Sequence, residues 1–278
     1  MYIDKTIMSF LLTSVICVAN AQEEEPKPLS KTESLKVLTA GADTFEIALE
    51  KDDKELEPVE RFEKPIYRYT DPSRKFQDGT VWAWGKKGRP IALATVTQDG
   101  RPDKLITETI ILADAPVSFL FNNNGQQRIP FRSDKDAKYS AQMKTMDVVP
   151  GKGASKSILA SQAKLLARRF KAHEIWNNDR KTEDRRYQLR LLSKPIHQYE
   201  DEKTEILHGS IFLFNYGSNP ELGLVLEAYK EGWKCGFFRL GHAAATVELD
   251  GKEFYSHPWF SGRNPHYIFS GISKPNLN

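Results

Sequence analysis

Short runs of apolar and β-branched residues predict β-strands from about residue 55 onward. Turn signals such as Gln77-Asp78-Gly79 separate the runs, and Asn124-Gly125 and Asp250-Gly251 are two-residue hairpin signals. The runs follow one another too closely for βαβ crossovers, so the predicted sheets are antiparallel. The predicted strands are 66–69, 81–84, 91–96, 105–112, 117–121, 187–191, 195–200, 208–215, 221–229 and 233–240, with a hairpin over 247–255.

Two stretches have helical periodicity, because their apolar residues recur every three or four positions. The first predicted helix begins at an N-cap, Thr32, and has the apolar positions Leu35, Leu38, Ala42, Phe45 and Leu49. The second has an apolar face of Leu159, Ala163, Leu166 and Phe170. Ile158 and Leu165 widen that second face, so we expect it to lie against a sheet.

The chain contains the same pattern twice, at a constant offset of 130 residues. Residues 65–71 (PIYRYTD) correspond to 195–201 (PIHQYED), and 79–84 (GTVWAW) correspond to 209–214 (GSIFLF). Over residues 65–97 six positions are identical, where composition alone would give roughly two. We therefore predict an α+β fold in which a helix-plus-antiparallel-β-meander unit is duplicated about a pseudo-two-fold axis, with the helices packed on the sheets.

The first 21 residues have the features of a secretory signal peptide. Lys5 lies in a basic n-region, residues 7–19 form an apolar h-region, and Ala19-Asn20-Ala21 is a cleavage site before Gln22. We expect an exported protein, periplasmic or secreted, with no transmembrane segment in the mature chain, since no later run reaches about 18 apolar residues. The predicted segments are a signal peptide (1–21), a disordered tether (22–31), a first repeat (32–125), a linker (126–156), a second repeat (157–256) and a C-terminal tail (257–278).

Composition narrows the class of protein. Hydrophobic residues make up 40% and aromatic residues 11% of the chain, which is typical of a globular protein. Cleavage would remove Cys17 and leave Cys235 alone, so no intramolecular disulfide can form and stability must come from a packed core. A net charge of +3 on 77 charged residues is nearly balanced, which argues against a nucleic-acid binder.

Several motifs resemble a family of exported proteins abundant in planctomycete bacteria. They are 166–170 (LARRF), 189–196 (LRLLSKPI), 209–214 (GSIFLF), 217–221 (GSNPE), 226–228 (LEA), and in the first half Trp84, Gly88-Arg89-Pro90 and Glu108. The resemblance covers roughly residues 35–255. It implies export, and because no function is established for the family it assigns no catalytic residue. Thr107 departs from the pattern, since a histidine is common there.

No cofactor motif is present, and we expect none to be bound: residues 151–157 (GKGASKS) lack the glycine spacing of a phosphate-binding loop. We also predict no metal site, because no histidine pair has metal-ligand spacing. His242, His257 and His266 could converge on a metal, or they could be three unrelated residues. Cys235 lies in a predicted strand, where a small buried hydrophobe is the expected role and a catalytic thiol is the alternative.

Glu108 and Glu227 are the candidate catalytic residues. Each lies in or beside an apolar predicted strand, and a pair of buried carboxylates can act as acid and base. Each could equally face solvent or meet an arginine such as Arg239.

Four aromatic residues form the candidate ligand-binding set. Trp82 and Trp84 share one face of a strand, and Phe212 and Phe214 share one face of the corresponding strand. Core packing is the favoured interpretation of all four, and an aromatic groove for a sugar, lipid or peptide is the other.

The absence of a catalytic or cofactor motif favours a non-catalytic exported protein, either a ligand-binding or a structural module of the cell envelope. A secreted hydrolase using a carboxylate pair is the alternative. The pattern of residues identifies neither the ligand nor the oligomeric state.

Overall fold

The computed structural model describes residues 29–51, 55–71, 76–98, 104–123, 126–127, 131–132, 143–151, 153–176, 185–260 and 267–274. The expected signal peptide and the predicted turn at Asn124-Gly125 lie outside these residues. Strands make up more than half of these described residues. The described helices are α1 (Lys31–Ala42) and α2 (Lys156–Ala167), each of 12 residues, and neither is long and apolar enough to cross a membrane.

The described strands form three sheets, and their pairings are antiparallel as predicted. Sheet I has the order β2-β1-β7-β8, with β9 also on β7: β1 (Phe45–Glu50), β2 (Leu56–Pro58), β7 (Val117–Asn123), β8 (Gln126–Gln127) and β9 (Phe131–Arg132). Sheet II has the order β19-β6-β5-β4-β3: β3 (Tyr67–Asp71), β4 (Phe76–Trp84), β5 (Ala92–Gln98), β6 (Lys104–Ile111) and β19 (Tyr267–Ser273).

Sheet III has nine strands in the order β10-β16-β15-β14-β12-β11-β17-β18, with β13 also paired to β14. The strands are β10 (Lys144–Thr145), β11 (Phe170–Trp176), β12 (Arg185–Leu191), β13 (His197–Asp201), β14 (Ile206–Tyr216), β15 (Asn219–Ala228), β16 (Trp233–Arg239), β17 (Ala244–Leu249) and β18 (Lys252–His257). Asp250 (φ +51°) and Gly251 (φ +82°) join β17 to β18, so the predicted hairpin turn there is confirmed.

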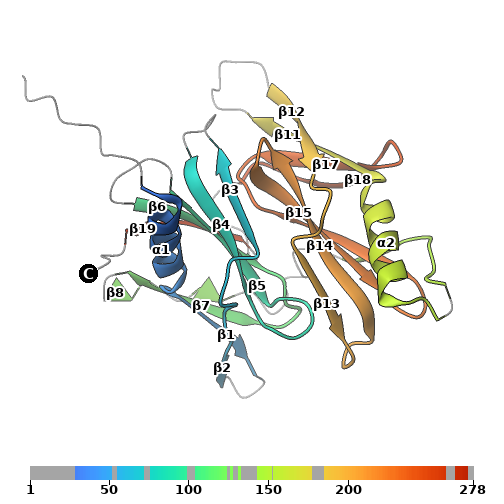
Figure 1. Cartoon of the computed structure of the whole chain (residues 1–278), viewed down its shortest axis with the longest axis horizontal. Helices are drawn as coiled ribbons and strands as arrows, with labels where there is room; N and C mark the ends of the chain where they lie inside the picture. Colours follow the sequence, from blue (N-terminus) through green and yellow to red (C-terminus); the bar gives the residue numbers. More distant parts are fainter. Residues whose placement is uncertain are drawn as a thin grey trace, which may run out of the picture.

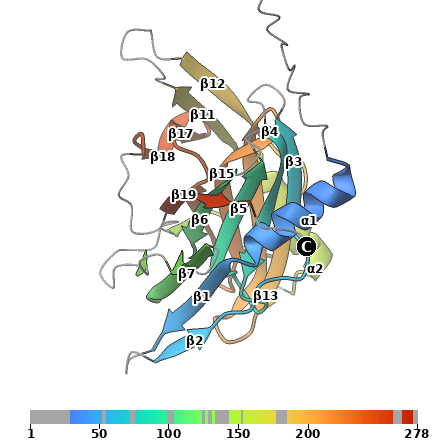
Figure 2. The ribbon, with the colours of Figure 1, turned by 90° about the vertical axis from the view of Figure 1, so that its left-hand side faces the viewer.

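Sheets II and III pack face to face, with α1 outside sheet II and α2 outside sheet III (Figure 1). Figure 2, seen from the α1 side, shows this helix lying across the strands of sheet II. The central strands are covered on one face by a helix and on the other by the opposite sheet. Since alternate side chains point to opposite faces of a strand, consecutive residues of these strands are apolar. The core between the sheets contains Val81, Leu93, Ile110, Ile211, Val225 and Phe238.

The predicted fold class is wrong. The protein is mainly antiparallel β with two short helices, not an α+β protein built from a duplicated helix-on-sheet unit. The helical periodicity of the sequence continues into residues that form strands: Phe45 and Leu49 lie in β1, and Phe170 begins β11. Strands from outside each predicted meander also enter the sheets, since β19 forms an edge of sheet II and β10 an edge of sheet III.

Single strand pairs do correspond at the 130-residue offset. β3 pairs with β4 through Tyr69 and Gly79, and β13 pairs with β14 through Tyr199 and Gly209. In both pairs the tyrosine ring lies where a Cβ on the glycine would stand. Each glycine therefore allows a tyrosine to cross its neighbouring strand closely.

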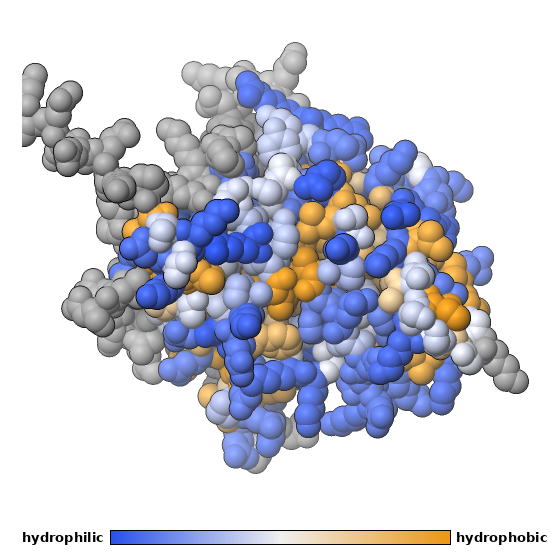
Figure 3. Space-filling view, in the orientation of Figure 1, coloured by the Kyte–Doolittle hydropathy of each residue, from blue (hydrophilic) through white to orange (hydrophobic). Residues whose placement is uncertain are grey.

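The outer face of α2 differs from the sequence prediction. Leu159, Ala163 and Leu166 are buried against sheet III as expected. Ile158 and Leu165 do not widen that buried face, because they are 50% and 62% exposed. Hydrophobic residues accordingly gather on the surface over α2 in Figure 3.

Candidate functional site

A cleft of about 700 Å³ opens where the start of α1 meets β3, β4 and β5. Ser218, in the turn between β14 and β15, also borders it, so sheets II and III both contribute. The volume lies in the range usual for small-molecule sites, roughly 300–1,000 Å³. The lining residues are Leu29, Lys31, Ser34, Arg68, Tyr69, Thr70, Asp78, Gln98 and Ser218.

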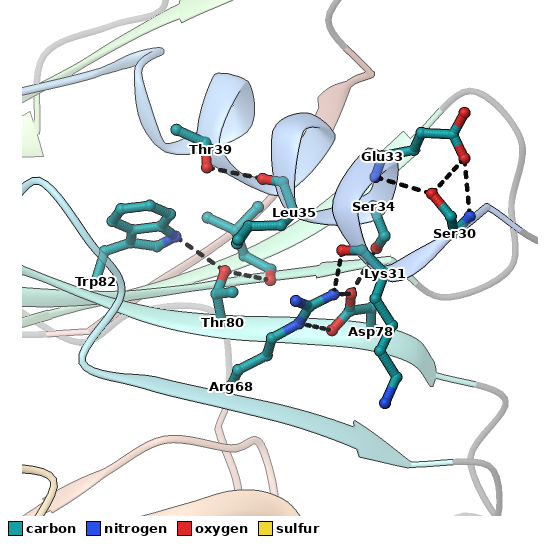
Figure 4. Close-up of polar contacts among 11 residues, drawn as sticks. Ser30, Lys31, Glu33, Ser34, Leu35, Thr39, Arg68, Asp78, Thr80 and Trp82 are labelled. Carbon is teal, nitrogen blue, oxygen red and sulfur yellow. Dashed lines mark hydrogen bonds and ion pairs between the residues drawn. The ribbon is translucent and has the colours of Figure 1, made fainter.

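An ion pair between Arg68 and Asp78 forms one wall of the cleft (Figure 4). Arg68 Nε donates to Asp78 Oδ1 at 2.9 Å, and Nη2 donates to Oδ2. Ser34 Oγ donates to Asp78 Oδ2 at 2.6 Å, and Arg68 Nη2 also donates to the carbonyl oxygen of Lys31 at 2.7 Å. Pairing with Asp78 raises the pKa of Arg68. These contacts join the first turn of α1 to β3 and β4, so they fix one side of the cleft.

The start of α1 is set by a capping box. Ser30, two residues before the predicted cap Thr32, is the N-cap. Its Oγ accepts from the backbone N–H of Glu33 at 3.3 Å, and Glu33 Oε2 accepts from the backbone N–H of Ser30 at 2.9 Å (Figure 4). The hydroxyl of Ser30, which also donates to Glu33 Oε2 at 2.6 Å, and then the backbone N–H of Ser30 lower the pKa of Glu33. The carboxylate of Glu33 is therefore committed to the cap.

Other polar groups that line the cleft have no hydrogen-bond partner among the described residues. Gln98 is only 5% exposed, yet its side-chain amide has no hydrogen-bond partner among the described residues. Arg68 Nη1 and the hydroxyl of Thr70 likewise have no hydrogen-bond partner within the described part of the chain. Because its polar atoms are not among the fully buried unpartnered ones of the described residues, the Gln98 amide is reached from the cleft and is available to a ligand.

The structure places Glu227 in an ion pair between sheets II and III. Its side chain is 0% exposed, and Arg89, from the turn between β4 and β5, binds it through Nε at 2.8 Å and Nη2 at 3.0 Å. The hydroxyls of Tyr199 and Tyr229 donate to Oε1 at 2.6 Å and to Oε2 at 2.8 Å. Burial, and then the charge of Glu227, raises the pKa of Tyr229. Each carboxylate oxygen thus accepts two hydrogen bonds.

Glu108 lies among different neighbours. Thr95 Oγ1 donates to its Oε2 at 3.2 Å. Glu108 and Glu221 both act electrostatically on the hydroxyl of Tyr69. Burial raises the pKa of Tyr69, and the charges of these two carboxylates raise it further. Glu108 therefore acts on the same tyrosine as Glu221, a carboxylate that the sequence did not single out.

The four candidate aromatic side chains lie in the core. Each is 1% exposed. Trp82 and Trp84 pack in the core beneath α1, and Phe212 and Phe214 pack in the core beneath α2. Trp82 Nε1 donates to Thr80 Oγ1 at 2.9 Å. Trp84 also borders a separate cleft of about 520 Å³ between the end of α1 and sheet I.

His242 and His257 make different side-chain contacts, although Arg239 lies beside both. The Nδ1 of His257 lies 3.0 Å from Arg239 Nη2, while His242 stacks on Phe260. Burial, and then Arg239, lowers the pKa of both, and that of His257 falls to about 4. His266 lies outside the described residues. Across the described ranges no group of three potential ligands could hold a metal ion.

Cys235 is expected to be unreactive in the native protein. It is fully buried, and burial raises the pKa of its thiol to about 12, so the nucleophilic thiolate is scarce near pH 8. A colorimetric thiol reagent should therefore modify no more than a trace of Cys235 in buffer and one thiol per mature chain in denaturant. Rapid labelling in buffer would show that the strand around Cys235 is not packed as described.

Sequence reasoning missed the cleft residues because their signals were weak. Asp78 belongs to a Gln-Asp-Gly turn signal, although it lies inside β4. Gln98 is the last residue of β5 and precedes another turn signal. A polar residue at a strand end is ordinary, so neither residue stood out.

Comparisons with known proteins gave no similarity: no protein-family model, curated protein or solved structure matches this chain. The interpretation of the cleft therefore rests on its own geometry.

Proposed function

We propose that this is an exported, non-catalytic protein that binds a small molecule in the cleft beside α1. The observation that carries the proposal is Gln98, a residue only 5% exposed whose side chain lines the cleft and whose amide has no partner within the described structure. A ligand would supply the missing hydrogen bonds. Export is supported by the signal-peptide features of residues 1–21.

The placement of the reactive side chains favours binding over catalysis. Both oxygens of Glu227 are occupied by fixed donors, which disfavours the hydrolase alternative, since a general base needs a free lone pair. A serine–histidine contact exists, with His208 Nε2 2.8 Å from Ser210 Oγ. Ser210 is 0% exposed, however, so a substrate does not reach it.

The proposal predicts that Gln98→Leu abolishes ligand binding without weakening the fold. Leucine keeps a similar volume and removes no hydrogen bond made within the described structure, so the free energy of unfolding should change by less than about 1 kcal/mol. Wild type and variant would be screened by thermal shift against a chemically diverse small-molecule library. A ligand at 100 times its Kd stabilises the native state by about 2.7 kcal/mol.

Gln162→Leu is the matched control, because it makes the same chemical change on α2. Ligands that raise the melting temperature of wild type and Gln162→Leu, but not of Gln98→Leu, support the cleft as the binding site. A screen without hits, or hits unaffected by Gln98→Leu, would instead favour a structural role in the envelope.

A further inference from the structure

Building on the proposed function, we propose that the ligand is a neutral, hydroxyl-rich molecule, of which a hexose is the simplest example. The first argument is charge. Arg68 and Asp78 neutralise each other in the wall of the cleft, and Glu33 is committed to the helix cap. Lys31 is the other charged residue among the described residues that line the cleft, but its side chain is exposed and flexible, so its charge is not held in a fixed position. A charged ligand would lose hydration without gaining a fixed counter-charge.

The second argument is the type of hydrogen bond on offer. The Gln98 amide both donates and accepts, Thr70 offers a hydroxyl, and Arg68 Nη1 donates. Hydroxyl groups also donate and accept, so adjacent hydroxyls on one ring can satisfy this mixed set. A carboxylate accepts only and an ammonium group donates only, so either would leave part of the Gln98 amide unpaired.

The third argument is the apolar part of the wall. Leu29 is 40% exposed, and it borders the same cleft as the buried ring of Tyr69. A small-molecule site usually combines apolar surface with a few placed polar groups. A sugar ring has both kinds of surface, since its C–H groups are apolar and its hydroxyls are polar.

The test compares ligands that share one ring and differ in charge. Glucose, galactose and mannose would be titrated into the mature protein by calorimetry at pH 7, beside the corresponding uronic acids and hexosamines. At least one neutral hexose should bind at least tenfold more tightly than its two charged counterparts. Thr70→Val, an exposed and nearly isosteric change, should weaken that hexose at least threefold and leave the melting temperature unchanged.

The outcomes separate the ligand class from the binding function. Tightest binding by a uronic acid or a hexosamine, or no binding by any neutral hexose, would overturn the ligand class. If other library compounds still bind in a Gln98-dependent manner, the binding function stands. If no compound of any charge binds in the cleft, both proposals fail.

Discussion

Arg89→Met is expected to destabilise the protein by about 3–5 kcal/mol, the usual cost of removing one partner of a buried ion pair. Methionine keeps much of the side-chain length, while the carboxylate of Glu227, 0% exposed, loses its counter-charge. Tyr199 and Tyr229 would still donate to it, which places the effect toward the lower end of that range. Urea denaturation measures the change directly.

Two further variants test the reason for this loss. Arg89→Met combined with Glu227→Gln should be less unstable than the sum of the single changes, because the uncompensated charge is gone. Lys86→Met, in the same turn, breaks an ion pair with Glu60 whose side chains are 50% and 77% exposed, and should cost less than about 1 kcal/mol. An Arg89→Met variant within 1 kcal/mol of wild type would show that the pair does not hold sheets II and III together.

Gly223→Ala is expected to cost about 3 kcal/mol or more. Gly223 in β15 pairs with Phe238 in β16, and the Phe238 ring lies where the new Cβ would stand. Phe238 is 0% exposed within the core between the two sheets, so its ring has little room to move. Overpacking of a core usually costs 1–3 kcal/mol and occasionally more.

Gly271→Ala is the control for this change, because it adds the same methyl group to an exposed position in β19 where the nearest atom is 3.9 Å away. It should change the free energy of unfolding by less than about 0.5 kcal/mol. Phe238→Leu should recover part of the loss in Gly223→Ala. Equal stability of Gly223→Ala and wild type would contradict the packing of β15 against Phe238.

The central strands were predictable from sequence because their signals are local. Apolar runs and turn residues located β4, β5, β14 and β15 to within a few residues. The helix ends were not, since periodicity alone continued the first helix through Phe45, which the sheet places in β1. Strand β19 was missed because it gains stability by pairing with β6, more than 150 residues earlier, and non-local pairing leaves no local signal.

The candidate site was less predictable than the fold. Glu227 was recognised as unusual, but its partner Arg89 lies 138 residues away and converts it from a candidate catalyst into part of an ion pair. The cleft depends on α1, three strands of sheet II and a turn of sheet III meeting in space. The spacing of residues along the chain does not indicate that these segments are adjacent in space. Gln98 is recognisable as a candidate only when its burial in the structure is known.

The most direct test of ligand binding in the cleft observes the Gln98 side-chain amide itself. Its two N–H resonances can be identified in a ¹⁵N–¹H spectrum by their absence from Gln98→Leu, and then followed while a bound hexose or library hit is titrated. Both resonances should shift and saturate at the Kd measured by calorimetry, because the amide gains the partners it lacks. Gln98 resonances that stay in place while the ligand binds would contradict the site.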